Sequence, residues 1–179
     1  EIKALHFSLS EVSPRTPFRF RLSGNIVHSN KEGRMALSGT IQNIPEDMDL
    51  SKGSVDARVE LKGLQTLHFW PYFKSFLPMD MLSGDLEVAA RYQGNFQGGF
   101  KASANIRFED LILDYPKVFA YVMKPKWMNV NLTVDYDHQD LKVPLLSMEL
   151  PELRVTAKGK IYGIGSKQMG IDAEAQSGS

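Results

Sequence analysis

The sequence predicts a mainly β fold: an antiparallel meander of about ten strands that forms a curved sheet or groove, or a sandwich, with one short helix plugging an end. Two observations predict it. Apolar and polar residues alternate through segment after segment, and polar turns connect them. In addition, Leu-Ser-Gly followed by one polar and one apolar residue occurs three times, at 22–26, 37–41 and 82–86. Alternate residues share one face of a strand, so each glycine marks a point on an apolar face where a bulky group comes close.

Four strands are expected in the first 63 residues. Residues 5–9 alternate first, and residues 18–26 and 35–41 form a hairpin whose polar turn ends at Gly33. The fourth strand, 55–61, turns apolar residues inward, and its outward neighbours are all charged: Asp56, Arg58, Glu60 and Lys62. A fully charged outer side is typical of an antiparallel sheet that has one face in water.

A single helix is expected next, because the apolar spacing changes to three or four residues between 65 and 77. Proline is tolerated only in the first turn of a helix. Pro71 therefore places the helix start near Phe69 or Trp70, and Pro78 closes the helix. Such an amphipathic helix is expected to plug one end of a β core. The alternative is a membrane-interface element, since Trp and Tyr favour that zone.

Six further strands follow the helix. They are expected at 86–92, 100–108, 130–136, 141–150, 153–161 and 171–175. The apolar positions slip by one residue near Pro144, which predicts a bulge or break there. We interpret 1–179 as a single β domain within a longer protein, with a β unit at 1–63, the amphipathic helix at 64–80 and a second β unit at 81–179.

The composition argues against several classes of function. Lys plus Arg equal Asp plus Glu at 21 each, so the basic excess of a nucleic-acid-binding protein is missing. The chain has no cysteine, and its four histidines lack the spacing of metal ligands. The acidic run at 135–140 fits a hairpin turn better than a calcium loop. Without a hydrolase elbow or a phosphate loop, we expect no catalytic residues, no metal and no cofactor.

The apolar face of the strands must be covered, because exposed apolar surface costs roughly 25 cal/mol per Å². One short helix cannot cover about ten strands. Two solutions remain open. The sheet packs on a second sheet as a sandwich with a filled core, which suits a structural or interaction module of a large envelope or surface protein. Otherwise it curls into an apolar groove, which suits an acyl chain.

The order of elements resembles the bacterial AsmA-like family. The resemblance rests on Leu64-Gln65-Thr66-Leu67, Phe69-Trp70-Pro71-Tyr72-Phe73, Phe76-Leu77-Pro78, Leu82-Ser83-Gly84-Asp85-Leu86 and Phe108-Glu109-Asp110-Leu111-Ile112-Leu113. It implies a periplasmic β groove, related to that of TamB, that serves phospholipid transport or outer-membrane biogenesis. It also implies an inner-membrane anchor outside this chain, possible contacts with other envelope proteins, and no catalytic residues.

If the groove is open, phospholipid or other acyl lipid is the expected ligand. The lipid-contacting residues predicted from strand parity are Phe18, Phe20, Leu22, Met35, Leu37, Leu86, Val88, Phe100, Ile106 and Phe108. Their common feature is an inward position on alternating strands.

Overall fold

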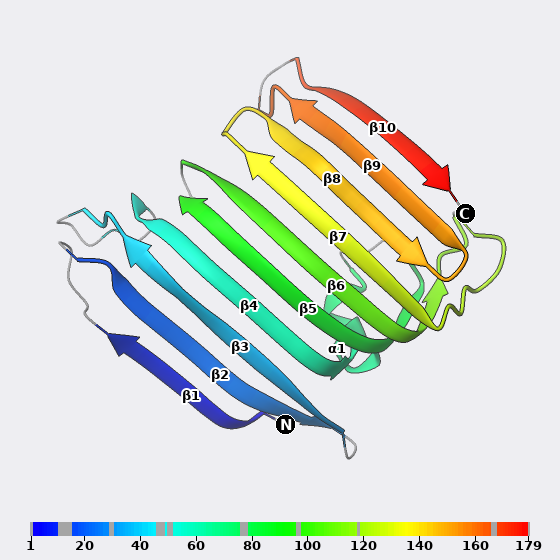
Figure 1. Ribbon diagram of the computed structural model, residues 1–179, viewed down its shortest axis with the longest axis horizontal. Helices are drawn as coiled ribbons and strands as arrows, with labels where there is room; N and C mark the ends of the chain where they lie inside the picture. The colour runs from blue at the N-terminus through cyan, green and yellow to red at the C-terminus, as the bar shows by residue number, and fades with distance from the viewer. Residues whose placement is uncertain are drawn as a thin grey trace.

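Ten strands form one antiparallel sheet in which each strand pairs with its neighbours in the sequence (Figure 1). The computed structural model describes residues 2–10, 16–28, 31–45, 49, 52–75, 79–95, 98–117, 119–165 and 168–178. The strands are β1 (Ile2–Ser10), β2 (Phe18–His28), β3 (Lys31–Gln42), β4 (Ser54–Gln65), β5 (Met81–Asn95), β6 (Gly99–Asp114), β7 (Trp127–Tyr136), β8 (Leu141–Leu150), β9 (Leu153–Tyr162) and β10 (Gly170–Gly178). The sheet is not closed, because β1 and β10 form its two edges. The predicted mainly β meander is confirmed, and among the described strands it takes the single-sheet form.

The strand register puts most of the apolar residues of the ten strands on one face. Residues directly opposite each other in an antiparallel pair point to the same side of the sheet. One unbroken cross-strand row consists of Phe7, Leu22, Leu37, Val59, Ala90, Ala104, Leu132, Leu146, Ala157 and Ala175. A polar row on the other face consists of His6, Ser23, Ala36, Glu60, Ala89, Asn105, Asn131, Ser147, Thr156 and Gln176. The alternation in the sequence is therefore kept in register across the whole sheet.

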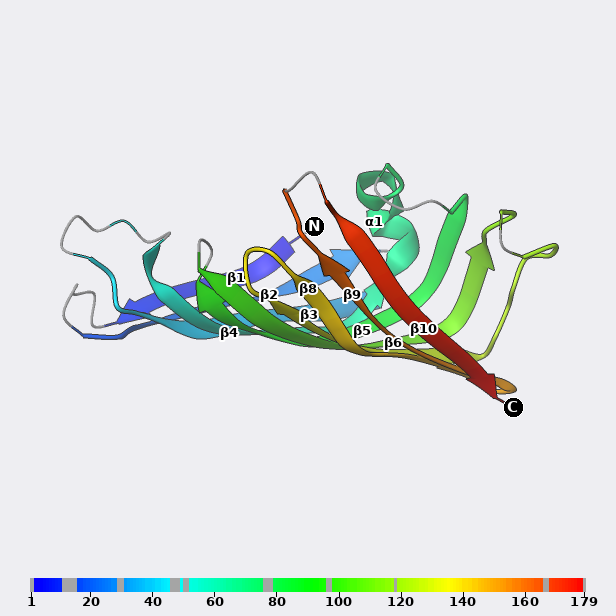
Figure 2. The same cartoon turned by 90° about the horizontal axis from the view of Figure 1, so that it is seen from above.

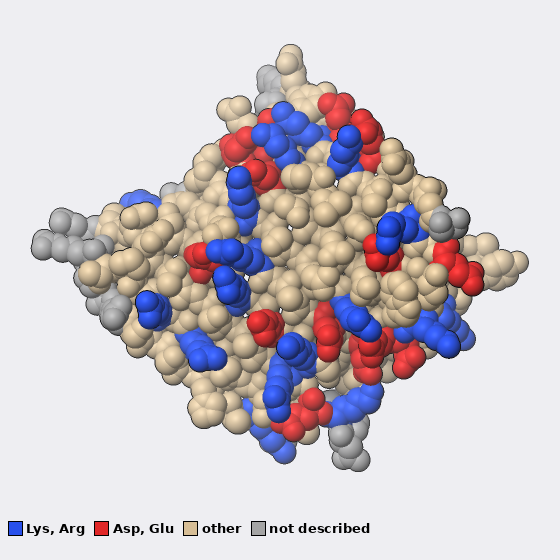
Figure 3. All heavy atoms as spheres, in the orientation of Figure 1, with Lys and Arg blue, Asp and Glu red and all other residues tan. Residues whose placement is uncertain are grey.

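The sheet is curved, and its two faces differ. Figure 2 shows the sheet bending toward the side that carries the helix α1 (Thr66–Phe73). We call this side, which carries the apolar row, the concave face, and the opposite side the outer face. On the outer face, positive and negative side chains are interspersed (Figure 3).

Bulges interrupt the register at several points. The predicted slip near Pro144 is confirmed as a register shift between Val143 and Leu146 in the β8–β9 pairing. The third Leu-Ser-Gly copy differs from the other two. Its Gly84 has φ +147° and lies where the β5–β6 register shifts, so it makes a bulge that a side chain would obstruct. At Gly39, in contrast, the prediction of close approach holds, because an added Cβ would stand 2.7 Å from Cζ of Phe20.

The helix begins earlier than the sequence predicts. It starts at Thr66, and Pro71 is its sixth residue instead of a first-turn residue. Thr66 is buried, and its hydroxyl donates a hydrogen bond of 3.0 Å to the Gly84 carbonyl oxygen, which ties the first turn to β5. This tertiary contact outweighs the preference of proline for the first turn of a helix. The predicted stop at Pro78 lies outside the described residues.

The core cluster lies at one end of the sheet. It comprises Phe108, Leu111, Leu113, Met128 and Leu150, of which Leu111 is only 1% exposed. Apolar side chains are also buried outside the core cluster, at Phe18, Ile44, Val55 and Leu64. The segment 115–126 folds back on the core cluster, because the backbones of Leu113 and Met123 exchange hydrogen bonds of 3.0 and 2.9 Å. The chain exposes 12119 Å² in total. A compact globular protein of this length exposes about 8,700 Å², so much of the apolar face lacks a protein cover.

Candidate functional site

The concave face is the candidate site, and the register places all ten predicted lipid-contacting residues on it. Phe18 and Phe108 are buried, at 4% and 8% exposure. Leu86 and Ile106 are half-buried and pack against the core cluster. The remaining six are half-buried side chains on β2, β3, β5 and β6: Phe20, Leu22, Met35, Leu37, Val88 and Phe100. The face is therefore covered at the core cluster and at Phe18, and partly exposed between them.

An aromatic row lies on this face toward the far ends of β5, β6 and β7 from the core. Phe100 stacks on Tyr92 with ring centroids 5.2 Å apart, and its ring lies 5.4 Å from that of Tyr136. Burial raises the pKa of the Tyr92 phenol above its ordinary value. Sequence reasoning selected only Phe100 from this row. Tyr92 and Tyr136 share the apolar parity of their strands, and that signal was sufficient to find them.

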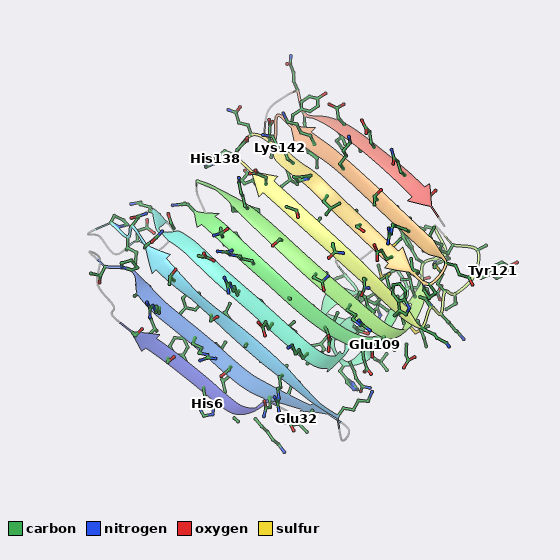
Figure 4. All side chains as sticks on the ribbon, viewed as in Figure 1. His6, Glu32, Glu109, Tyr121, His138 and Lys142 are labelled. Carbon is green, nitrogen blue, oxygen red and sulfur yellow. The ribbon has the colours of Figure 1, made fainter. Side chains whose placement is uncertain are left out.

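The core end of the sheet carries an exposed apolar tip. Tyr121 and Val122, in the segment that joins β6 to β7, are 85% and 42% exposed. Figure 4 shows Tyr121 lying beyond the ends of the strands. Lys117, Lys124 and Lys126 belong to the same segment and are exposed, so the tip combines apolar and cationic side chains.

The outer face carries surface ion pairs. Arg91 binds Asp56 with two hydrogen bonds of 2.7 and 3.1 Å, and Gln93 donates a third of 3.0 Å. The Arg91 hydrogen bond is the main reason that the pKa of Asp56 lies below its ordinary value; burial opposes this and the Gln93 bond assists it. Exposed pairs of this kind contribute little stability individually. Their effect is to keep the outer face hydrated and balanced in charge.

The acidic turn between β7 and β8 uses its carboxylates for structure. Asp137 accepts a hydrogen bond of 3.0 Å from the backbone N–H of Asp140, which is the main cause of its lowered pKa. Lys142 and Lys160 pair with Asp137 and Asp140 at 3.5 and 2.6 Å, and Figure 4 shows Lys142 at this turn. Within the described residues, no group of three or more potential metal ligands comes together. The arrangement is that of a capped hairpin turn.

Hollows occur on the outer face and near the Pro144 bulge. Two, of about 480 and 400 Å³, lie over β1–β4 among polar and charged side chains. Two smaller ones, of about 220 and 360 Å³, flank Pro144 on β8. The concave face, in contrast, offers its apolar side chains as a broad, curved surface.

No family model matches the chain, and neither curated proteins nor solved structures show significant similarity to it. In the part of the chain that the structure describes, no helix is both long enough and apolar enough to span a membrane.

Proposed function

We propose that the concave face binds lipid acyl chains and that the chain is a non-enzymatic, periplasmic segment of an AsmA-like protein acting in phospholipid transport or outer-membrane biogenesis. The observation that carries this proposal is the unbroken apolar row across ten strands on a half-exposed face. Such a face requires an apolar partner, and hydrocarbon supplies one without needing hydrogen bonds.

The dimensions of the face support an acyl ligand. Nine inter-strand steps of about 4.8 Å span about 43 Å along the row. The acyl chains of one leaflet span about 15 Å, half of the bilayer's hydrocarbon core. The row is thus longer than two acyl chains placed end to end. Each buried methylene contributes about 0.8 kcal/mol, so burying ten of them supplies about 8 kcal/mol before the cost of immobilisation.

Native mass spectrometry of the purified 179-residue chain, combined with solvent extraction, is the first test. We expect co-purified phospholipid, and we expect the lipid-extracted chain to bind a fluorescent phospholipid. Ala104→Asp places a carboxylate within the apolar row on β6 and should reduce this binding at least tenfold, because a charge cannot be desolvated cheaply by hydrocarbon.

Ser103→Asp is the matched control. Ser103 is the preceding residue on β6, is exposed and lies on the outer face, so the same charge enters the same strand on the other side. It should leave lipid binding unchanged. Circular dichroism of both variants verifies the fold. A folded, lipid-free chain that ignores added phospholipid would refute the proposal, as would equal losses in the two variants.

The competing function is an interaction module whose concave face is covered by another protein or a second copy. The native mass of the same purified chain distinguishes this function from lipid binding. If a second copy covers the concave face, the chain is a dimer without lipid, and Ala104→Asp makes it monomeric. If a different protein covers it, the purified chain is monomeric and binds no lipid. If it binds lipid, the mass of the complex exceeds that of one chain by whole numbers of lipid molecules.

A further inference from the structure

A cationic hollow on the outer face lies apart from the proposed lipid surface. It has a volume of about 480 Å³ and covers β2, β3 and β4, with β1 at its rim. The residues that line it include three arginines, Arg19, Arg21 and Arg58, and the hydroxyl-bearing Ser38 and Thr40. All three arginines are exposed. We call this site the arginine hollow.

The strand register puts the three arginines at neighbouring positions on one face. Arg21, Ser38 and Arg58 are consecutive members of one cross-strand row, so the two arginines stand two strand spacings apart, about 9.6 Å, with the Ser38 hydroxyl between them. Arg19 lies two residues along β2 from Arg21, on the same face and about 6.7 Å away. Arginine side chains are long enough to meet over Ser38 and Thr40 from these positions.

The charge of the hollow is not balanced by its own lining. Asp56 is the acidic residue among the lining side chains, and Arg91 and Gln93 of β5 already engage both of its carboxylate oxygens. Among the described residues, no ion pair is formed by Arg19, Arg21 or Arg58. Arg58 lies near enough to Asp56 to help lower the pKa of that carboxyl, but no ion pair joins the two side chains. Three arginines therefore line one hollow without a hydrogen-bonded carboxylate.

We propose that the arginine hollow binds a phosphate group. A guanidinium offers two parallel N–H donors that match the oxygens of a phosphate, and hydroxyls donate further bonds to the same group. A single carboxylate needs only one arginine, whereas a phosphate has enough acceptor oxygens to engage several at once. The phosphate belongs either to a phospholipid headgroup in a membrane or to a soluble molecule. This site goes beyond the proposed acyl-binding function and does not depend on it.

Two probes distinguish the sources of the phosphate. Inorganic phosphate is titrated into a nitrogen-15 labelled chain, and its binding is measured from backbone amide chemical shifts. Vesicles of phosphatidylcholine, with or without phosphatidylglycerol, are tested by co-sedimentation. At low salt we expect phosphate to shift amides of residues 19–21, 38–40 and 56–58. Arg58→Gln should weaken phosphate binding about tenfold, because each charge-assisted hydrogen bond is worth roughly that factor. Arg58→Lys should restore part of the lost phosphate affinity, since lysine keeps the positive charge but lacks the paired N–H donors of a guanidinium.

Arg154→Gln is the matched control. Arg154 lies on β9, pairs with Glu149 at 3.0 Å, and its loss changes the net charge by the same amount. It should leave phosphate affinity unchanged. Vesicle binding that depends on phosphatidylglycerol and on Arg58 identifies the headgroup as the source, whereas phosphate binding without vesicle binding identifies a soluble ligand. Binding of neither probe, or equal losses in Arg58→Gln and Arg154→Gln, overturns the proposal.

Discussion

The contrast between a sealed core and an open concave face yields a quantitative prediction for two leucines. Leu111 is 1% exposed and lies within the core cluster of β6, β7 and β8. Leu37 lies in the apolar row on β3 and is half-buried, with its free side facing the concave space. The same substitution by alanine should therefore have very different costs at the two positions.

The magnitudes follow from burial. Truncating a fully buried leucine to alanine costs about 3 kcal/mol, since the loss of transfer free energy adds to the cavity that remains. At Leu37 one side already meets solvent, so no closed cavity forms and the cost is about 1 kcal/mol. For a domain of this size, each kcal/mol shifts Tm by about 2–4 °C. Leu111→Ala should lower Tm by about 6–12 °C, and Leu37→Ala by about 2–4 °C.

Urea unfolding and thermal melts of the lipid-extracted chain measure both differences. Ile171→Ala on the edge strand β10, where Ile171 is 66% exposed, is the control and should change the free energy of unfolding by less than about 0.5 kcal/mol. A loss at Leu37 as large as that at Leu111 would refute the reasoning, because it would mean that the concave face is covered in solution.

Two further predictions concern single contacts. Gly39→Ala should lower the free energy of unfolding in urea by about 1–3 kcal/mol, because its Cβ would meet the backbone carbonyl oxygen of Asp56 and would stand 2.7 Å from Cζ of Phe20. An unchanged midpoint would mean that neither the β4 backbone nor the ring lies this close to Gly39. Arg91→Gln should remove a pH-dependent part of the stability. The pKa of Asp56 is lowered chiefly by the Arg91 hydrogen bond, so this stability is present above the unfolded-state pKa of about 3.9 and is lost as pH falls through the lower folded-state pKa. The difference between wild type and variant should be constant above about pH 5 and shrink below about pH 4; a difference independent of pH would show that Arg91 acts through another group.

The sequence was sufficient to predict what depends on local alternation. Strand positions, the inward parity of Leu37 and Phe100, and the bulge near Pro144 all follow from a two-residue period and its slip at Pro144. An antiparallel meander with short connections pairs strands in chain order, so parity within each strand extends to parity across the sheet.

What the sequence could not show depends on contacts between distant residues. The helix start at Thr66 is set by its hydrogen bond to the Gly84 carbonyl, which no local propensity encodes. Gly84 follows the same Leu-Ser pair as Gly39, yet it forms a bulge because β6 offers two residues opposite one of β5. The core cluster around Leu111 likewise requires residues 119–126 to fold back, and their irregular pattern gives no such signal.

The two proposed binding surfaces use the same strands through opposite faces. On β3, Leu37 belongs to the concave row and Ser38, the next residue, lines the arginine hollow. The hydrogen-bonded backbone of β2, β3 and β4 separates them. A phospholipid whose acyl chains lie along the concave row therefore cannot place its own phosphate over Ser38, and the arginine hollow requires a second molecule or a membrane surface. For this reason Ala104→Asp should reduce lipid binding and leave phosphate binding intact, and Arg58→Gln should do the reverse. A variant that loses both lipid and phosphate binding would have lost its fold instead of one site.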